Sequence, residues 1–287
     1  MKIRIFLFAV LLVSGFASVA AQSGQWQLRV MTYNLRAGTM ATMDQIAEAI
    51  NECNPDFVAL QEVDCNTYRP NAKATGNNGV NFVNELAQRT GMFGYFGTTI
   101  PLPPPASVCD SLSALVATGN NKNALPAMGH YYGIALLSRY PAKKVETFDL
   151  PNPLGAEPRI MLMGNFIIDD TVRVNFASVH LDYTNPGTIA LQAEAVSGIA
   201  AQSGPAIIAG DFNTEPDSDA YRILCRDAAI LSGTSPTFPS DNPGQRLDHI
   251  FGFPARDFRL IETREGTSGQ CKNPVVKIWI KIANFAE

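Results

Sequence analysis

Polar side chains that could hold a cation or move a proton stand at the ends of several apolar segments. Asn34 closes the segment Val-Met-Thr-Tyr-Asn, Glu62 closes Phe-Val-Ala-Leu-Gln-Glu, and His180 closes Phe-Ala-Ser-Val-His. Asp211 and Asn213 follow Ile-Ile-Ala-Gly. A reactive group at a strand end is held rigidly while it faces solvent, and carboxylate and amide oxygens suit Mg²⁺ or Mn²⁺. These residue types could place a hard cation, a water molecule and hydrogen-bond donors around one anionic group.

Each of these residues also has an ordinary structural explanation. An Asn or Asp after a strand commonly forms a turn, a Glu at that place commonly faces water, and a single His is more often structural than catalytic. Shared chemistry is indicated only if the fold brings the whole set together.

Segments with strand and helix patterns alternate along the chain, and they must position these side chains. A stretch from 91 to 130, which is rich in proline, is expected to be largely loop. Residues with helical spacing predict helices at 42–53, 80–90, 188–202 and 218–227. Short β-rich runs predict strands at 28–33, 56–63, 132–138, 159–168, 172–179, 206–209, 247–251, 258–263 and 275–283.

The order of these segments predicts an α/β sandwich. Asp169 and Asp170 join two predicted strands and indicate an antiparallel hairpin. Hairpins mixed with strand-helix alternation favour antiparallel sheets covered by helices over one doubly wound parallel sheet. The chain has no internal repeat and no charge run, so residues 22–287 are expected to form a single domain.

Residues 1–21 are typical of a secretory signal peptide. Lys2 and Arg4 precede an apolar run from Ile5 to Val13, and small residues end at Ala20 and Ala21. A retained membrane anchor is the alternative, but the unbroken run is shorter than the roughly 20 residues that span a bilayer. We therefore expect export to the periplasm or the medium, without a stable membrane anchor.

The exported part is acidic and contains all five cysteines. Removal of the leader takes away two cations and no acidic residue, so the net charge changes from −4 to −6. This charge disfavours a broad basic face that holds nucleic acid. An odd number of cysteines leaves at least one unpaired; a pair between Cys65 and Cys109, both in polar loops, is as plausible as none.

Five motifs in order give the sequence a family resemblance. The chain resembles the endonuclease/exonuclease/phosphatase superfamily, with its deoxyribonuclease-I-like fold, over nearly the whole mature sequence. Two further segments, Tyr132–Arg139 and Glu157–Arg159, resemble exported bacterial members. The resemblance implies a four-layer α/β sandwich of two packed, mostly antiparallel sheets flanked by helices. The motifs are Met31-Thr-Tyr-Asn34, Leu60-Gln-Glu62, Ser178-Val-His180, Gly210-Asp-Phe-Asn213 and Leu247-Asp-His-Ile250.

The resemblance also implies a role for each motif residue. Glu62 would be the main ligand of Mg²⁺ or Mn²⁺, with Asn34 beside it and near the substrate. Asp211 would orient or deprotonate the attacking water, Asn213 would help to hold water and phosphate, and His180 would donate to a phosphate oxygen.

The family pattern breaks near the C-terminus. Asp248 would orient a second histidine from a Ser-Asp-His triplet, but alignment on Asn273–Val276 places Gln270, Cys271 and Lys272 there. Arg159 and Lys272 are the remaining expected substrate contacts. Lys272 either pairs with Asp248 over the site or is solvated; its ammonium could stabilise a phosphate but could not readily accept a proton from water.

The two other histidines are expected to be structural. His249 follows Asp248 directly in a predicted strand, where neighbouring side chains point to opposite faces. If Asp248 faces the site, His249 faces away. His130 lies in a loop with no motif around it, and we expect it to be solvated rather than part of the site.

Two functions remain open. The first is an exported Mg²⁺- or Mn²⁺-dependent phosphoesterase, weakened by loss of the Asp-His pair, whose substrate is a small or lipid-derived phosphodiester or phosphomonoester rather than long nucleic acid. The second is a noncatalytic family member that binds phosphorylated or anionic ligands. Other enzyme classes lack support, because the sequence has no Gly-x-Ser-x-Gly, no His-Glu-x-x-His and no Gly-x-x-x-x-Gly-Lys motif.

Overall fold

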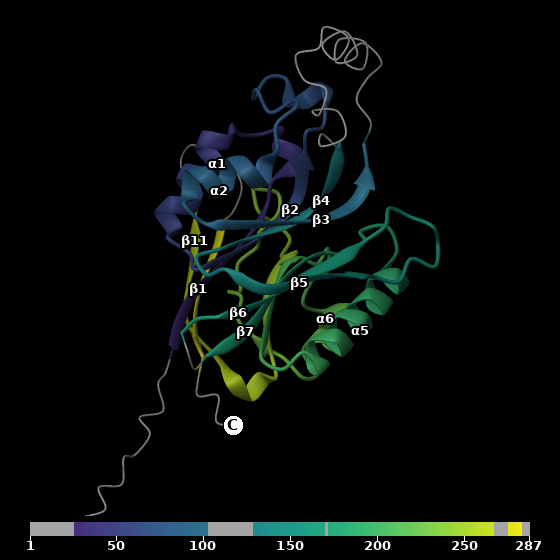
Figure 1. The fold of residues 1–287 in the computed structure, drawn as a ribbon. Helices are drawn as coiled ribbons and strands as arrows, with labels where there is room; N and C mark the ends of the chain where they lie inside the picture. Colours follow the sequence, from purple (N-terminus) through teal and green to yellow (C-terminus); the bar gives the residue numbers. More distant parts are fainter. Residues whose placement is uncertain (1–25, 103–128, 170–171, 267–274, 283–287) are drawn as a thin grey trace, which may run out of the picture.

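Two six-stranded sheets lie face to face, and helices cover their outer faces (Figure 1). The computed structural model describes residues 26–102, 129–169, 172–266 and 275–282. The first sheet has the order β11–β12–β1–β2–β4–β3 and the second β5–β6–β7–β8–β10–β9. The strands of the first sheet are β1 (Trp26–Asn34), β2 (Phe57–Cys65), β3 (Phe93–Pro101), β4 (Tyr131–Ser138), β11 (Phe258–Gly266) and β12 (Val275–Ile282). Those of the second are β5 (Ala142–Asp149), β6 (Ile160–Ile167), β7 (Arg173–His180), β8 (Ala206–Asp211), β9 (Ala229–Ile230) and β10 (Asp248–Phe253).

In the part of the chain that the structure describes, each outer face carries two helices, and short capping signals set where they begin. Helix α1 (Met43–Cys53) starts with a capping box in which Thr42 accepts from the Gln45 backbone N–H and the Gln45 side chain accepts from Thr42. The other helices, each opened by an Asn or Ser cap, are α2 (Phe82–Thr90), α5 (Pro186–Gln202) and α6 (Asp219–Leu224). Short 3-10 turns lie at Arg36–Gly38, Pro70–Ala72 and Ala255–Asp257.

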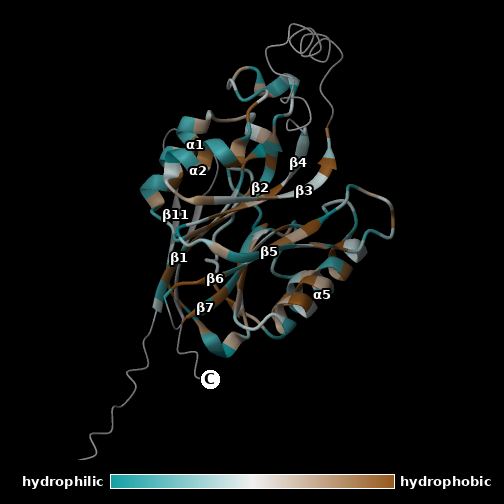
Figure 2. Cartoon of the chain, viewed as in Figure 1, coloured by the Kyte–Doolittle hydropathy of each residue, from teal (hydrophilic) through white to brown (hydrophobic). Residues whose placement is uncertain are grey.

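Three apolar layers separate the four structural layers. Side chains alternate along the strands, so one face of each sheet packs on the opposite sheet and the other face packs on helices. In β2, for example, Phe57 and Ala59 face the second sheet, whereas Val58 and Leu60 face α1 and α2. Figure 2 shows strongly apolar residues on strands such as β6 and β7 and polar ones on the outer side of α1 and α2. The predicted four-layer α/β sandwich is confirmed.

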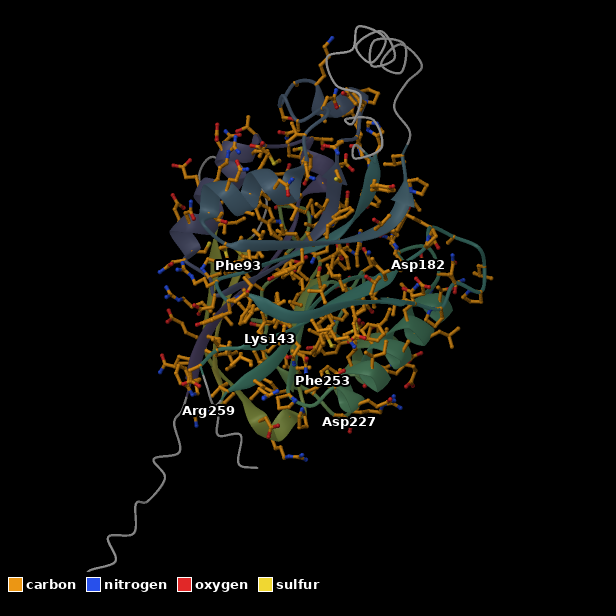
Figure 3. All side chains as sticks on the ribbon, viewed as in Figure 1. Phe93, Lys143, Asp182, Asp227, Phe253 and Arg259 are labelled. Carbon is orange, nitrogen blue, oxygen red and sulfur yellow. The ribbon has the colours of Figure 1, made fainter. Side chains whose placement is uncertain are left out.

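Strand direction determines where the polar strand ends meet. Only β1 with β2 and β7 with β8 pair in parallel, and all other neighbours are antiparallel. The carboxyl ends of parallel neighbours lie at the same edge. In Figure 3, Asp182, which follows β7 closely, lies at the right of the molecule, away from Phe93 at the start of β3. The polar residues that end these four strands therefore share one edge of the sandwich, called the site edge below.

Three strands were not expected from the sequence, and one prediction was wrong. The stretch 91–130 is not largely loop at its start, because β3 occupies Phe93–Pro101 and pairs with β4. Its glycines weaken the strand pattern, yet a Cβ at Gly94 would lie 2.6 Å from Cγ1 of Val83 in α2. Strand β5 is a charged edge strand, and β9 has two residues. Helix α6 is also shorter than the predicted 218–227.

Several expectations concern residues outside the described ranges. They include the signal peptide at 1–21, Cys109 as a partner of Cys65, and the segment with Gln270, Cys271 and Lys272. Among the described helices, none is both long enough and apolar enough to cross a membrane.

Candidate active site

A cavity of about 610 Å³ opens at the site edge. Both sheets contribute to it, so residues far apart in sequence face the same space. Of the expected site residues, Lys272 lies outside the described residues, and all the others line this cavity: Asn34, Glu62, Arg159, His180, Asp211, Asn213 and Asp248.

Asn34 connects the carboxylates of the two sheets. Its Nδ2 donates to Oε1 of Glu62 at 2.9 Å and to Oδ2 of Asp211 at 3.0 Å. Its Oδ1 accepts the backbone N–H of Arg36 at 2.9 Å, which fixes the orientation of the amide. A single amide therefore holds one acidic group from each sheet, and one of them, Asp211, is 177 positions from Asn34 in the sequence.

A bulge in β2 brings Glu62 to this position. The register between β2 and β4 shifts between Leu60 and Val63, and both of these residues face the helix layer although they are three positions apart. Glu62 has a φ of 52°, a left-handed conformation that is unfavourable for a residue with a side chain. The extra residue of the bulge allows Gln61 and then Glu62 to be directed toward the second sheet.

His180 is held as a neutral hydrogen-bond donor. Nη1 of Arg159 lies 3.1 Å from Nδ1 of His180, and since arginine can only donate, the ring proton is on Nε2. Burial, and secondarily the positive charge of Arg159, lowers the pKa of His180 well below its ordinary value. Nε2 lies 3.9 Å from Oδ2 of Asp211. At neutral pH the imidazole can donate to an oxyanion from Nε2.

Arg159 is almost fully buried beside this histidine. It is 4% exposed, and its Nη1 also lies 2.9 Å from Oε1 of Glu157. The guanidinium therefore orients His180 from behind while part of the residue lines the cavity. Its expected contact with substrate stays a prediction.

Asp211 and Asp248 are directly opposite each other on β8 and β10. Burial raises the pKa of Asp211 to about 6, opposed by the hydrogen bond from Asn34 and that from the backbone of Asn213, with Glu62 adding repulsion. Burial and the charge of Asp211 raise the pKa of Asp248 well above its ordinary value. A carboxylate with such a pKa is a stronger base than a solvated one, which suits proton abstraction from water.

Asn213 closes the turn after β8. Its backbone N–H donates to Oδ1 of Asp211 at 3.0 Å, and its Nδ2 donates to the Leu181 carbonyl at 2.9 Å. Its φ of 48° is left-handed, a conformation that Asn tolerates better than most residues. Asn213 is therefore both a turn residue and a site residue, since the turn that it forms fixes the Asp211 carboxylate.

The structure separates His249 from this group. Its side chain is fully buried on the opposite face of β10, where Nε2 lies 2.8 Å from the Thr214 carbonyl and the ring packs against Phe212 and Tyr221. The expected structural role is confirmed. Nδ1 of His130 contacts the Asn66 carbonyl, and His130 is not among the residues that line the cavity.

Several lining residues were missed by the reading of the sequence. Tyr132 and Glu157 belong to segments that resemble family members, so a signal for them existed. Thr237 has no such signal; its Oγ1 accepts the backbone N–H groups of Leu247 and Asp248 at 3.1 and 3.2 Å. The missed lining residues are Arg36, Tyr132, Glu157, Tyr183, Thr237, Phe238, Ser240, Gln245 and Leu247.

The donor set fits a hard divalent cation. Among the described residues, no three His, Cys, Asp or Glu side chains converge to form a closed metal cage. Mg²⁺ does not need one, because it commonly keeps several waters and binds through one or two carboxylates. Glu62 adds to the repulsion on Asp211, and a cation beside these oxygens would relieve it. Glu62 would hold the ion directly. Asn34 would join it through Oδ1, the amide oxygen that here accepts from Arg36, because its Nδ2 is a donor and does not bind a cation.

Comparisons with known proteins agree with this geometry. A model described as "Endonuclease/Exonuclease/phosphatase family" matches residues 31–261. A search of curated proteins gives no match. Three similar solved structures, all below 25% identity, support the fold. An endonuclease/exonuclease/phosphatase from Beutenbergia cavernae has a TM-score of 0.68 at 20% identity, over 90% of this chain and 72% of that chain. A family protein from Bacteroides thetaiotaomicron has a TM-score of 0.62 at 17% identity, over 91% of this chain and 96% of that chain. The human Nocturnin catalytic domain with bound sulfate has a TM-score of 0.61 at 15% identity, over 90% of this chain and 95% of that chain.

Proposed function

Since the chain belongs to the endonuclease/exonuclease/phosphatase family, which includes hydrolases of phosphate esters, we propose that it is an exported, Mg²⁺- or Mn²⁺-dependent phosphoesterase. One observation carries the proposal: Asn34 hydrogen-bonds both Glu62 and Asp211 next to the Nε2 of a neutral His180. This arrangement has the carboxylates, the base and the donor that hydrolysis of an anionic ester requires.

The residues divide the work of hydrolysis. Asp211 accepts a proton from a water molecule that Asn213 helps to hold, and the water oxygen then forms a bond to phosphorus while the ester bond breaks. The departing alcohol oxygen takes a proton from solvent water. His180 donates from Nε2 to a phosphoryl oxygen as negative charge develops on it. A bound Mg²⁺ or Mn²⁺, held by Glu62 and Asn34, would supply Lewis-acid stabilisation of that charge.

Two features of the sequence and one of a similar protein support the choice of substrate and location. The acidic net charge favours small or lipid-derived phosphate esters over long nucleic acid. The basic, then apolar, then small-residue pattern of residues 1–21 favours export. The relative Nocturnin holds a sulfate, an anion of the same shape as phosphate, in its solved structure.

A noncatalytic binding protein is the second candidate. Gln270, Cys271 and Lys272 stand where the family triplet has its acidic residue and imidazole, so the group expected to complete acid-base catalysis is replaced. General acid-base catalysis typically contributes about 10² to 10⁴ in rate, and we expect activity to be lower by a factor in that range.

Hydrolysis assays with the purified chain separate the two candidates. The panel contains nitrophenyl phosphate mono- and diesters, sphingomyelin, inositol phosphates and DNA, each with Mg²⁺, Mn²⁺ or EDTA. Turnover that needs the metal supports the enzyme. Metal and phosphate binding without any turnover supports the binding protein.

Glu62→Gln tests the metal site directly. We expect Mg²⁺ affinity to fall at least tenfold in a calorimetric titration, because the variant loses the negative charge next to the ion. The thermal midpoint should not fall, since Glu62 lies at the cavity rather than in a packed layer. Glu48→Gln is the matched control, because Glu48 is exposed on α1 and does not line the cavity. Equal Mg²⁺ affinity in Glu62→Gln and wild type would remove Glu62 from the site.

A further inference from the structure

Two exposed aromatic rings line the cavity. The Tyr183 side chain is 70% exposed and that of Phe238 is 40% exposed. Seven other large apolar residues are also exposed in the described parts of the chain, but none of them lines the cavity. Exposed apolar residues scattered singly need no explanation, whereas two rings at the mouth of one polar cavity suggest a ligand that covers them.

Phe238 is presented by a closed and anchored loop. Phe238 N–H donates to the Gln245 carbonyl at 2.9 Å, and Gln245 N–H returns a 2.9 Å hydrogen bond to the Phe238 carbonyl. The preceding Thr237 side chain accepts from the backbone of Asp248, which is in the site itself. The backbone that carries the ring is therefore anchored relative to Asp248, and little backbone freedom remains to be lost when a ligand binds.

A cation lies next to this ring. The guanidinium carbon of Arg36 is 6.0 Å from the centre of the Phe238 ring, and the backbone N–H of Arg36 donates to Asn34. Arg36 is exposed and lines the cavity. The rim therefore offers an aromatic face and a positive charge side by side, which matches a ligand with a flat ring close to an anionic group.

Tyr183 is fixed by its neighbours rather than by its own side chain. The backbone N–H of Asp182 donates to Oε1 of Gln192 at 2.7 Å, and the Asp182 carboxylate accepts the Thr184 hydroxyl at 2.8 and 3.0 Å. Both residues that flank Tyr183 are thus fixed by hydrogen bonds within four positions of His180, while Tyr183 itself is exposed at the cavity.

We propose that Tyr183 and Phe238 form an aromatic subsite for a planar ring carried by the alcohol portion of the phosphate ester that is bound at Glu62, Asp211 and His180. The inference rests on the proposed function and sharpens it: the substrate is a small phosphate ester that carries a nucleobase or an aryl group, rather than a lipid ester. Stacking on an aromatic side chain favours a flat ring over an alkyl chain, and it tolerates many ring types because each has a π-face. A volume of about 610 Å³ is within the range of small-ligand sites.

The test compares ligands of similar size that differ in planarity. Binding of phenylphosphonate, cyclohexylphosphonate and inorganic phosphate is measured by calorimetry with the full mature chain in Mg²⁺, so that turnover is not needed. We expect phenylphosphonate to bind about tenfold more tightly than cyclohexylphosphonate. Phe238→Leu and Tyr183→Ala should each lower the affinity for phenylphosphonate at least threefold. The affinity for cyclohexylphosphonate should change by less than twofold.

Phe93→Leu is the control, because Phe93 is 48% exposed on β3 at the opposite side of the molecule from Asp182 (Figure 3). Thermal midpoints of all variants are measured to exclude misfolding. If both phosphonates bind equally in wild type, the aromatic subsite is refuted while the proposed function stands. If inorganic phosphate and both phosphonates fail to bind, both proposals are refuted.

Discussion

Two groups of polar side chains lie next to each other on the same strands and differ in burial and in charge. Between the sheets, the Thr32 hydroxyl donates to Gln61, and the Gln61 amide donates to Ser178, which donates to the Leu60 carbonyl. These side chains are fully buried, neutral and mutually satisfied. We call Thr32, Gln61 and Ser178 the inter-sheet network.

The second group lies only one or two residues further along. Asn34, Glu62 and His180 follow the three network residues on β1, β2 and β7, and Asp211 and Asp248 complete the group from β8 and β10. The three carboxylates of this group face one cavity. Burial and the charge of Glu62 raise the pKa of Asp211, and burial and the charge of Asp211 raise the pKa of Asp248. The comparison teaches that the hydrogen bonds of the network align the strand ends. The buried carboxylates instead lower the stability of the fold, as is common where charged groups are placed for function.

The largest effect that tests this contrast is the loss of catalytic rate that we expect in Asp211→Asn. The change keeps the shape of the side chain and removes its basicity. We expect kcat to fall by about 10² to 10⁴ and KM to change much less, because only proton abstraction is lost. Steady-state kinetics on an active nitrophenyl ester measures both. Wild-type kcat in the variant would exclude Asp211 as the base.

The next largest effect is a loss of stability when the inter-sheet network is interrupted. Gln61→Leu leaves the buried hydroxyls of Thr32 and Ser178 short of a partner, so we expect the free energy of unfolding to fall by about 2–4 kcal/mol. Urea denaturation measures it. Gln88→Leu, at an exposed position on α2, is the control and should change stability by less than about 0.5 kcal/mol. If Gln61→Leu left the free energy of unfolding unchanged, the contrast between the two groups would be wrong.

The smallest expected effect is a gain of stability in Asp211→Asn without metal. A carboxyl whose pKa is raised to about 6 contributes stability below its unfolded pKa near 4, and this contribution is lost as the pH rises through 6. At pH 7.5 in EDTA, we expect the variant to be more stable than wild type by about 1–3 kcal/mol, and the difference should vanish near pH 4.

Urea denaturation at the two pH values provides this measurement. Asp227→Asn, on the outer surface (Figure 3), serves as the control that removes a charge without removing repulsion in the cavity. A variant less stable than wild type at both pH values would mean that the Asp211 carboxylate stabilises the fold instead of straining it.

The sequence predicted the strand ends better than it predicted what surrounds them. Strand patterns are local signals, and they placed Asn34 and Glu62 at strand ends; the resemblance of their motifs to the family implied that the two lie side by side. The bulge that turns Glu62 toward the second sheet is set by pairing with β4, so no local pattern indicates it. Strand β3 was missed for a similar reason, since Gly94 makes room for Val83 of α2, a contact that exists only after folding.

The residues at the rim were hardest to predict. Arg36 reaches the cavity from a left-handed turn with a φ of 48°, and Phe238 from a loop closed by hydrogen bonds to Gln245. Tyr183 stands outside any motif. These side chains line the cavity because of how loops close over it, and single-sequence patterns report helices and strands rather than loop closure.

The direction of the strands also has a consequence for how this architecture can diversify. At the edge opposite the site, consecutive described elements are joined by short connections, at residues 54–56, 91–92, 139–141, 203–205 and 254–257. The described connections that follow β1, β2, β5, β7, β8 and β9 lie at the site edge, and most of them are longer. Insertions or deletions there would reshape the cavity without altering any ladder hydrogen bond, because the two sheets are already closed by the short turns on the far side. Recombination of loops at one edge is thus a route by which related chains could acquire new substrates on an unchanged framework.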